Sequence, residues 1–300
     1  MNGVEPSPAT ASPRRVAFVG NRPLVFDAAL AFRELSIEWT WVVAGSLLER
    51  RLLDLGRPFT AFSAADGPTL IGELLRTPFD LLISSGCPLR LPVSQLSRPG
   101  RLLLNVHPSP LPDMRGLHPI NGALLYDRKL AGATMHHLRD GLDTGPVISQ
   151  ELLEVTGDLD LGLLYHVIFR LEAAVFTSGM LELIESGFSA AGKEQTGETS
   201  NYSRQPEDAR IDPAGMDDAE ILRRVRAFGV GTQGTICPIG GATLRVFDVR
   251  LVTHPALLAE FAAVPPGEVA LAYDGKLLVK TRQSLALFTS FSVIEGDLPI

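Results

Sequence analysis

The run RLLLNVHPSPLP, residues 101–112, carries the main signal for the architecture of this chain. Its apolar half does not alternate with polar residues, which is typical of a strand buried on both faces of a parallel sheet. Asn105 and His107 end the strand two positions apart, so their side chains share one face. In open α/β sheets, strand ends line the crevice where ligands bind. The run therefore predicts a buried parallel strand with a polar site at its end.

Toward the N-terminus, short apolar runs alternate with helical patterns. The expected strands span residues 15–20, 38–44, 59–62 and 80–85. The expected helices span residues 23–35, 46–55 and 67–75, and Ser46 is expected to cap the second of them. Repeated β-α-β units predict an α/β fold class with a Rossmann-like, mostly parallel sheet.

Toward the C-terminus the pattern changes. Residues 117–126 are expected to form a helix, 132–138 and 146–154 paired strands, and 160–186 a long helix that Asp158 or Asp160 caps and Gly187 ends. A polar section without periodicity follows, and then a helix at 217–228 and several short strands. Asp274-Gly275 between two apolar runs is a hairpin signal, so we expect a small, open, OB-like β-barrel there.

These patterns predict four consecutive parts of the chain. They are a disordered leader at 1–13, an N-terminal catalytic domain at 14–191, a linker at 192–216 and a smaller C-terminal open β-barrel domain at 217–300.

Composition excludes several classes of protein. The formal net charge is −7, with acidic and basic residues mixed along the chain, which disfavours a surface for nucleic acid. The first residues lack the apolar core of a secretory signal, and no apolar run approaches the roughly 18 residues that span a bilayer. Cys87 and Cys237 stand far apart and form no metal-binding motif. We therefore expect a cytoplasmic protein with two reduced thiols, no metal site and no membrane partner.

A second polar cluster, DGLDTG at residues 140–145, lies between two expected strands. Alone, such a cluster is typical of a hairpin turn. Together with the first cluster it supplies Asp143, a carboxylate able to hydrogen-bond His107 and fix which ring nitrogen carries the proton. Prolines at 108, 110 and 112 restrict the backbone after His107 and so preorganise its imidazole. The two clusters are candidates for one shared site.

The string NVHPSPLPDMRGLHPIN (105–121), followed by GATMHHLRDGLDTGPVI (132–148), resembles the core of the folate-dependent formyltransferases. The resemblance implies the formyltransferase fold, 10-formyltetrahydrofolate as co-substrate, and a catalytic trio that falls on Asn105, His107 and Asp143. Formyl transfer to an amine makes the carbonyl oxygen negative, and Asn105 and a protonated His107 are suitable donors to it. Asp143 is suited to receive or relay the proton of the amine.

The resemblance also implies contacts to the folate. It places the pterin ring against residues 86–92 and against the loop that precedes Asp143. The implied folate contacts are Gly86, Arg90, Leu91, Pro92, Leu138, Asp140 and Gly141.

For the amine that receives the formyl group, we expect a small molecule, such as an amino-sugar nucleotide, an amino acid or a siderophore precursor. The segment RGLHP resembles the sugar-modifying members of the family, and acids match the cations of the C-terminal part. The expected acceptor contacts are Asn21, Arg22, Arg115 and His118. The alternative acceptor is methionyl-tRNA, for which a basic surface would be expected.

Three other functions remain as competitors. A 10-formyltetrahydrofolate hydrolase uses the same trio with water as acceptor but carries an N-terminal regulatory module, so we rank it lower. An intact trio argues against a catalytically silent folate-binding protein. Gly20-Asn21-Arg22 is not the GxGxxG fingerprint, which disfavours a nicotinamide-dependent dehydrogenase. A homodimer is compatible with the sequence.

Overall fold

The computed structural model describes residues 12–296, which form two compact units. The first unit contains the described residues up to 115 together with 132–152 and 168–200, and the remaining described residues form the second. The units interleave along the chain, whereas the sequence predicts domains that follow one another. Residues 1–11 of the predicted leader lie outside the described residues.

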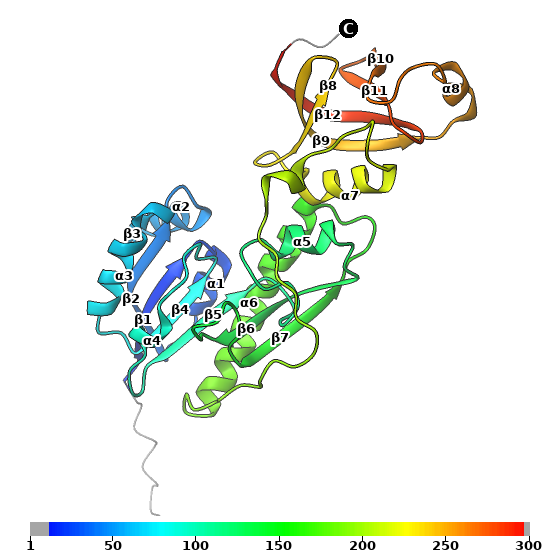
Figure 1. Cartoon of the computed structure of the whole chain (residues 1–300). Coiled ribbons are helices and arrows are strands. Elements are labelled where there is room, and N and C mark those ends of the chain that lie inside the picture. The colour runs from blue at the N-terminus through cyan, green and yellow to red at the C-terminus, as the bar shows by residue number, and fades with distance from the viewer. Residues whose placement is uncertain (1–11, 297–300) are drawn as a thin grey trace, which may run out of the picture. The chain divides into compact units, whose positions relative to one another are not determined.

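A seven-stranded sheet forms the centre of the first unit, in the order β3-β2-β1-β4-β5-β6-β7 (Figure 1). The pairs β1/β2, β1/β4, β2/β3 and β4/β5 are parallel, and β6 is antiparallel to β5. The predicted Rossmann-like, mostly parallel sheet is thus confirmed. Its strands are β1 Arg14–Gly20, β2 Leu35–Val43, β3 Thr60–Phe62, β4 Leu81–Ser85, β5 Leu102–His107, β6 Leu130–His137 and β7 Val147–Glu154.

The strand order reverses beside β1. From β1 the chain runs outward through β2 to β3, and it then crosses to the other side of β1 to form β4. Ligands of open α/β sheets bind at such a switch point, outside the carboxyl ends of the strands. The loops that begin at Gly20 and Gly86 therefore flank the place where the topology favours a ligand.

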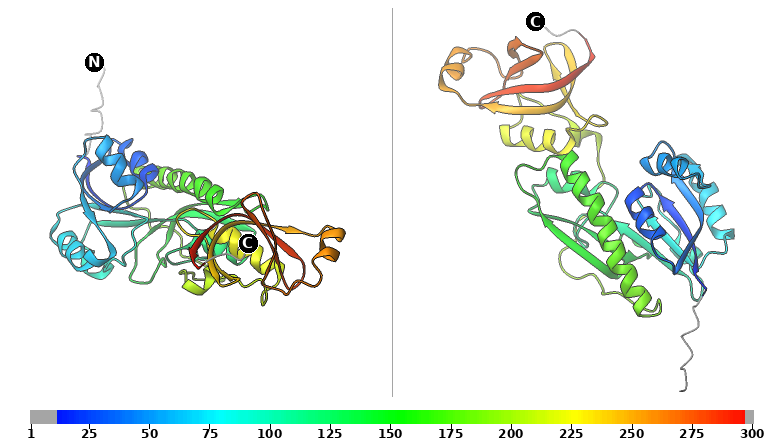
Figure 2. Two further views of the ribbon diagram at one scale, coloured as in Figure 1. Left: turned by 90° about the horizontal axis from the view of Figure 1, so that it is seen from above. Right: turned by 180° about the vertical axis from the view of Figure 1, so that it is seen from behind.

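Helices cover both faces of this sheet. They are α1 Pro23–Leu30, α2 Leu47–Asp54, α3 Gly67–Arg76, α4 Val93–Leu96 and α6 Leu161–Glu185, with a short 3-10 helix at Ala64–Asp66. Helix α5 Pro119–Leu125 belongs to the second unit. Side chains from α1 and α6 pack on one face, which we call the α1/α6 face, and α6 crosses the strands along much of its length (Figure 2). Side chains from α3 and α4 pack on the other, the α3/α4 face.

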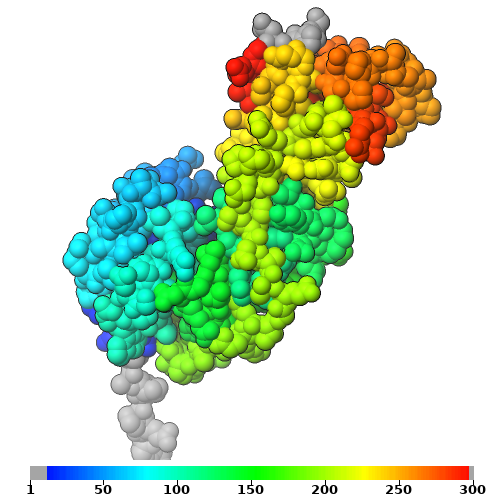
Figure 3. Space-filling view, in the orientation of Figure 1, coloured from blue at the N-terminus to red at the C-terminus, as the bar shows by residue number. Residues whose placement is uncertain are grey.

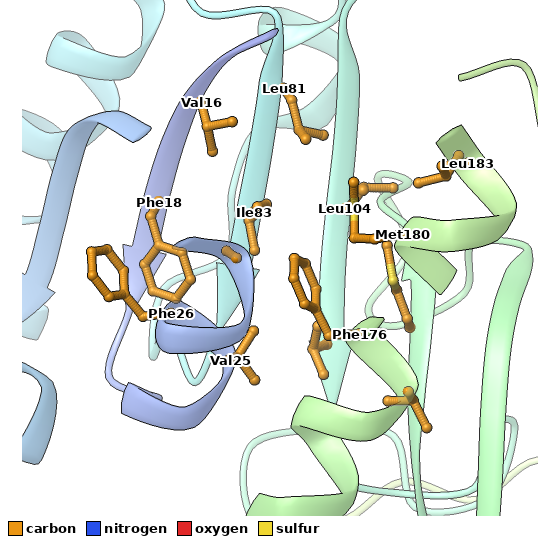
Figure 4. Packing of buried hydrophobic residues seen from close by; sticks show 14 of the residues in the cluster. Val16, Phe18, Val25, Phe26, Leu81, Ile83, Leu104, Phe176, Met180 and Leu183 are labelled. Carbon is orange, nitrogen blue, oxygen red and sulfur yellow. The ribbon is translucent and has the colours of Figure 1, made fainter. Parts of the chain in front are cut away.

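Successive residues of the central strands point to opposite faces, as strand geometry requires. On the α1/α6 face, Phe18 of β1 meets Phe26 of α1 edge to face, with ring centroids 5.1 Å apart. Figure 4 shows residues of this cluster from both layers: Val16, Phe18, Leu81, Ile83 and Leu104 from the sheet, and Val25, Phe26, Phe176, Met180 and Leu183 from the helices. Burial on both faces explains why these strands read as unbroken apolar runs.

Several predicted helix boundaries are confirmed by their caps. The Ser46 hydroxyl accepts a hydrogen bond from the backbone N–H of Glu49, and an Asp160 carboxylate oxygen accepts one from that of Leu163. Gly187 ends α6 with a φ of +64°. The prediction that the first helix reaches residue 35 is wrong: α1 ends at Leu30, because Leu35 already pairs with Arg14 in the β1/β2 ladder.

The second unit contains a five-stranded antiparallel sheet in the order β10-β11-β12-β9-β8. Its strands are β8 Thr235–Ile239, β9 Ala242–Val252, β10 Val269–Tyr273, β11 Lys276–Lys280 and β12 Leu285–Glu295. Helix α7 Asp218–Phe228 packs Ile221 and Val225 into the core of this sheet, and α8 Pro255–Glu260 and a 3-10 helix at Pro206–Ala209 complete the unit. The predicted hairpin at Asp274-Gly275 is confirmed, since both residues have positive φ. Within residues 12–296, no helix is both long and apolar enough to cross a membrane.

Candidate active site

The candidate site begins at the end of β5. Asn105 pairs in register with Ser84 of β4 on one side and with His136 of β6 on the other, and His107 pairs with Thr134. The Thr134 hydroxyl donates to the carbonyl of Ser109, which ties the proline-rich segment after His107 back to the sheet. Asn105 and His107 therefore stand on two firmly paired positions of one strand face.

Asp143 reaches the same place from the loop between β6 and β7. Its φ of +52° is in the left-handed region, which aspartate tolerates better than most residues. Two residues later, a side chain at Gly145 would put its Cβ 1.7 Å from the carbonyl oxygen of His137. The loop can therefore fold this tightly over the end of β6 only with glycine at position 145.

The structure brings the three predicted catalytic side chains together. Asp143 Oδ2 lies 3.7 Å from His107 Nδ1, and Asp143 Oδ1 lies 3.4 Å from Asn105 Nδ2, which donates to it. His107 and Asp143 are buried and Asn105 is partly buried. In this environment the carboxylate faces both an imidazole and an amide with little competition from water.

The second ring nitrogen of His107 has a fixed role. Nε2 lies 3.0 Å from the carbonyl oxygen of Met114. A carbonyl only accepts hydrogen bonds, so Nε2 carries a hydrogen and donates it. The Nδ1 side of the ring is then the side that faces Asp143.

His136 belongs to the same cluster, although the sequence analysis did not single it out. Its Nδ1 donates to the carbonyl of His137 at 2.8 Å, so Nε2 is the acceptor and receives a hydrogen bond from Asn105 Nδ2 at 3.1 Å. Complete burial lowers the pKa of His136 to about 4, with a smaller lowering by His107, while Asp143 acts in the opposite direction. A neutral His136 therefore orients the Asn105 amide. Its place in β6, two residues after Thr134, is a signal that could have identified it.

Gln195 is a second residue of the site that the sequence analysis missed. Its Nε2 donates to the backbone carbonyls of Asp143 and Gly145, both at 2.8 Å, and its Oε1 accepts from Arg115 at 2.7 Å. Gln195 lies in the section predicted as a linker, where no periodicity gave a signal. The residues up to Ser200 belong to the first unit, and Ser200 itself accepts from the N–H of Met114. Figure 3 shows the yellow-green chain around residue 200 on the surface of the molecule.

The two loops predicted to hold the folate lie against each other. The Arg90 guanidinium donates to the carbonyl of Asp140, and the N–H of Ser94 donates to the Asp140 carboxylate at 3.0 Å. Leu91 and Leu138 join the apolar cluster of the α3/α4 face. Among the remaining predicted contacts, Pro92 directly precedes α4, Gly141 packs on Thr144, and Gly86 turns with a φ of +67°.

The predicted acceptor contacts lie in different environments. Arg22 donates to Asn21 Oδ1 at 2.7 Å and to Glu172 at 2.8 Å. Arg115 is bound to Gln195, as described above. His118 belongs to the second unit, where its Nδ1 accepts from the N–H of Arg204 and burial lowers its pKa.

The described residues hold no cluster of three or more His, Cys, Asp or Glu side chains arranged to bind a metal ion. Cys87 and Cys237 are free thiols. Burial raises the pKa of Cys87 to about 11 and that of Cys237 to about 12, so neither is a nucleophile at neutral pH.

Comparison with known proteins relates this site to a family. Residues 58–179 match the family model of the formyl transferases, and residues 204–294 match that of the formyl transferase C-terminal domain. The chain is similar to methionyl-tRNA formyltransferases from Clavibacter sepedonicus (33% identity over 62% of this chain) and Herminiimonas arsenicoxydans (32% over 70%). It spans 58% and 68% of their respective lengths.

A solved structure shares the fold. An N-formyltransferase from Helicobacter canadensis, in complex with folinic acid and dTDP-3-aminofucose, superposes with a TM-score of 0.63 at 14% identity and covers 92% of this chain and 99% of its own. Such low identity shows the fold alone. The two family models, together with relatives of about one-third identity, establish that this chain belongs to the formyl transferase family.

Proposed function

We propose that this chain transfers a formyl group from 10-formyltetrahydrofolate to a primary amine. The observation that carries the proposal is the contact of the Asp143 carboxylate with both Asn105 and His107. A buried carboxylate beside an amide and an imidazole offers both a proton acceptor and hydrogen-bond donors at one place.

The roles of the side chains follow from their partners. Asn105 uses one N–H for His136, and its contact with Asp143 is long at 3.4 Å, so this second N–H can turn to the formyl oxygen as that oxygen becomes negative. A protonated His107 donates from Nδ1 to the same formyl oxygen. Its Nε2–H meanwhile keeps its hydrogen bond to the carbonyl of Met114. The new C–N bond forms between the amine and the formyl carbon. Asp143 accepts the amine proton and passes it to the carrier nitrogen, whose bond to the formyl carbon breaks.

The loops around Arg90 and Asp140 fit the donor. 10-Formyltetrahydrofolate supplies the formyl group and a flat ring with polar edges. Leu91 and Leu138 pack in the apolar cluster behind these loops, while Arg90 and Asp140 provide polar atoms beside it. We propose that this pair of loops, with Gly86, Pro92 and Gly141 shaping its backbone, holds the pterin ring.

Methionyl-tRNA is the acceptor that the relatives favour. Both curated relatives are described as methionyl-tRNA formyltransferases, and the C-terminal family model covers most of the second unit. This supports our alternative acceptor better than the small molecule that we expected first. We therefore place methionyl-tRNA first among the acceptors to be tested.

A small-molecule amine is the second candidate, because the arginines of α7 are largely engaged inside the second unit. Arg224 pairs with Glu220 and donates to the backbone carbonyls of Glu207 and Asp208. Arg226 donates to the carbonyls of Leu159 and Thr156. Side chains held in this way are poorly placed to bind phosphates. We propose Asn21, Arg22, Arg115 and His118 as acceptor contacts in either case.

Turnover of 10-formyltetrahydrofolate by the purified protein tests the proposal. The reaction is followed with methionyl-tRNA, with dTDP-3-aminofucose, and without any amine. Release of tetrahydrofolate that depends on an amine, with formyl label found on that amine, supports transfer. Equal release without an amine would indicate hydrolysis, and folate binding without release would indicate a silent binding protein.

A further inference from the structure

A buried ion pair joins the β1–α1 loop to α6. Arg22 Nε donates to Glu172 Oε2 at 2.8 Å, and the Arg22 guanidinium lies 4.0 Å from the centroid of the Phe169 ring. The Glu172 side chain is fully buried, and Arg22 is only 17% exposed. Arg22 is thus held by a carboxylate and an aromatic ring from one helix.

This pair lies at the topological switch point. Arg22 is the last residue of the β1–α1 loop. A Cβ at Gly86 would lie 2.0 Å from Asn21 Oδ1, which itself accepts from Arg22. The N–H of Asn21 also donates to the carbonyl of Ser85 at the end of β4. The ends of β1 and β4 and the Arg22 guanidinium are therefore one connected group at the edge where ligands bind.

Burying the Glu172 carboxylate costs free energy and leaves part of its hydrogen-bonding capacity unused. Burial raises the pKa of Glu172 to about 7, although Arg22 acts to lower it. Its Oε1 has no hydrogen-bond partner among the described residues. An apolar residue would fill the same space without these costs, so stability alone does not explain a glutamate here. Perturbed, partly satisfied carboxyl groups of this kind are more often found at functional sites.

The two faces of the sheet separate this pair from Leu91 and Leu138 of the proposed folate loops, whereas Gly86 of those loops lies against Asn21. Leu91 and Leu138 belong to the cluster of the α3/α4 face. Val25 follows Arg22 by three residues and Phe176 follows Glu172 by four, and both belong to the cluster of the α1/α6 face. The α1/α6 side of the switch point is therefore available to the second substrate, the amine.

We propose that Glu172 is a positioning residue for the amine substrate, holding Arg22 at the switch point so that Arg22 donates to an oxygen atom of that substrate. The proposal rests on the proposed function. Arg22 uses one N–H for Glu172 and one for Asn21, and three further N–H groups of its guanidinium remain for a substrate oxygen. Because Glu172 balances its charge, Arg22 acts here as an oriented donor.

Steady-state kinetics of two Glu172 variants test this proposal. Glu172→Leu fills the buried space without accepting a hydrogen bond, whereas Glu172→Gln retains an oxygen that can accept from Arg22. We expect Glu172→Leu to raise the KM for the amine about tenfold, corresponding to the loss of one hydrogen bond between charged groups. The kcat and the KM for 10-formyltetrahydrofolate should stay within about twofold, and Glu172→Gln should lie between the wild type and Glu172→Leu. The amine is whichever of the two proposed acceptors supports turnover.

Two comparisons separate positioning from a structural role. Glu182→Gln, at an exposed glutamate of the same helix, should leave all constants unchanged. In an Arg22→Ala background, Glu172→Leu should raise the amine KM no further, because Glu172 acts through Arg22. An unchanged amine KM in both Glu172 variants overturns the proposal, whatever the melting temperatures of these variants. An equal rise in the KM for the amine and in the KM for 10-formyltetrahydrofolate also overturns it. A wild type that uses neither amine overturns the proposed function and this proposal with it.

Discussion

Asn105 is the residue whose contribution can be isolated most directly, because its side chain is polar and hydrogen-bonds two residues of the candidate site. Its amide donates to His136 Nε2 and to an Asp143 carboxylate oxygen. Replacement by alanine therefore removes a donor with little loss of packing.

We expect Asn105→Ala to lower kcat by about 100-fold or more, because one preorganised donor to a developing oxyanion contributes about 2.7–4 kcal/mol. The KM for 10-formyltetrahydrofolate should change little. Asn201→Ala, at an exposed asparagine, serves as the control in the same assay. A variant at position 105 with wild-type kcat would remove Asn105 from the catalytic group.

His136 predicts a pH dependence of stability. Its pKa is lowered by burial from 6.5 to about 4, so the unfolded chain binds the proton more readily than the folded one. The free energy of unfolding should therefore be unaffected above pH 6.5 and fall as the pH drops from 6.5 toward 4. The loss attributable to this residue is at most about 3 kcal/mol. Denaturant unfolding at several pH values measures it.

The matched variants for this titration are His136→Gln and His254→Gln. His136→Gln should flatten the acid limb of the stability profile, since its amide does not titrate in this range. His254 is exposed, so its replacement should leave the profile as in the wild type. An acid limb that persists in His136→Gln would assign the pH dependence to other groups.

At the scale of elements, the segment from residue 193 to residue 200 holds the loops of the candidate site together. Lys193 forms a β-bridge with Val147, Gln195 binds the backbone of Asp143 and Gly145, and Ser200 binds the segment after β5. These contacts add to those that Arg90 and Ser94 make with Asp140 in the loop that carries Asp143.

We expect Gln195→Leu to lower kcat by tenfold or more, because two hydrogen bonds to the Asp143 loop are lost and each contributes about 0.5–1.5 kcal/mol. A purely structural effect would lower the melting temperature without a selective fall in kcat. Glu194→Gln, which breaks only an exposed ion pair with Arg139 in the same segment, is the control. Equal kcat values for the two variants would contradict a positioning role for Gln195.

At the scale of the whole molecule, charge bears on the choice of acceptor. The chain has a formal net charge of −7, and two of the three arginines of α7 bind carbonyl groups of their own unit. Phosphate contacts supply most of the affinity for nucleic acids and make it dependent on salt. A chain with these features is expected to make few such contacts.

The salt dependence of KM therefore distinguishes the two acceptors. If methionyl-tRNA is used, its KM should rise with the KCl concentration. The slope of log KM against log [KCl] should be no steeper than about 3, because each phosphate contact adds about 0.9 or less to this slope. The KM for a small amine should change by less than about twofold over the same range. A slope near 8 would reveal a phosphate-binding surface that the charge distribution does not predict.

Local patterns predicted most of the elements correctly. The apolar runs of β4 and β5, the caps at Ser46 and Asp160, and the turn at Asp274-Gly275 depend on neighbouring residues, so the sequence contains the information directly. The end of α1 was missed, because pairing of Leu35 with Arg14 is a contact between segments. Such pairing overrides the helical spacing of apolar residues.

By itself, the sequence determined the strand that carries Asn105 and His107 and the family to which their motif belongs, since both follow from residues close together in the chain. Only the tertiary structure decided that His136 and Gln195 contact the residues of the candidate site and that Glu172 binds Arg22. Each of these side chains meets its partner across 31 to 150 residues. Hydrogen bonds over such separations depend on how strands and helices pack, which the periodicity of a single segment does not encode.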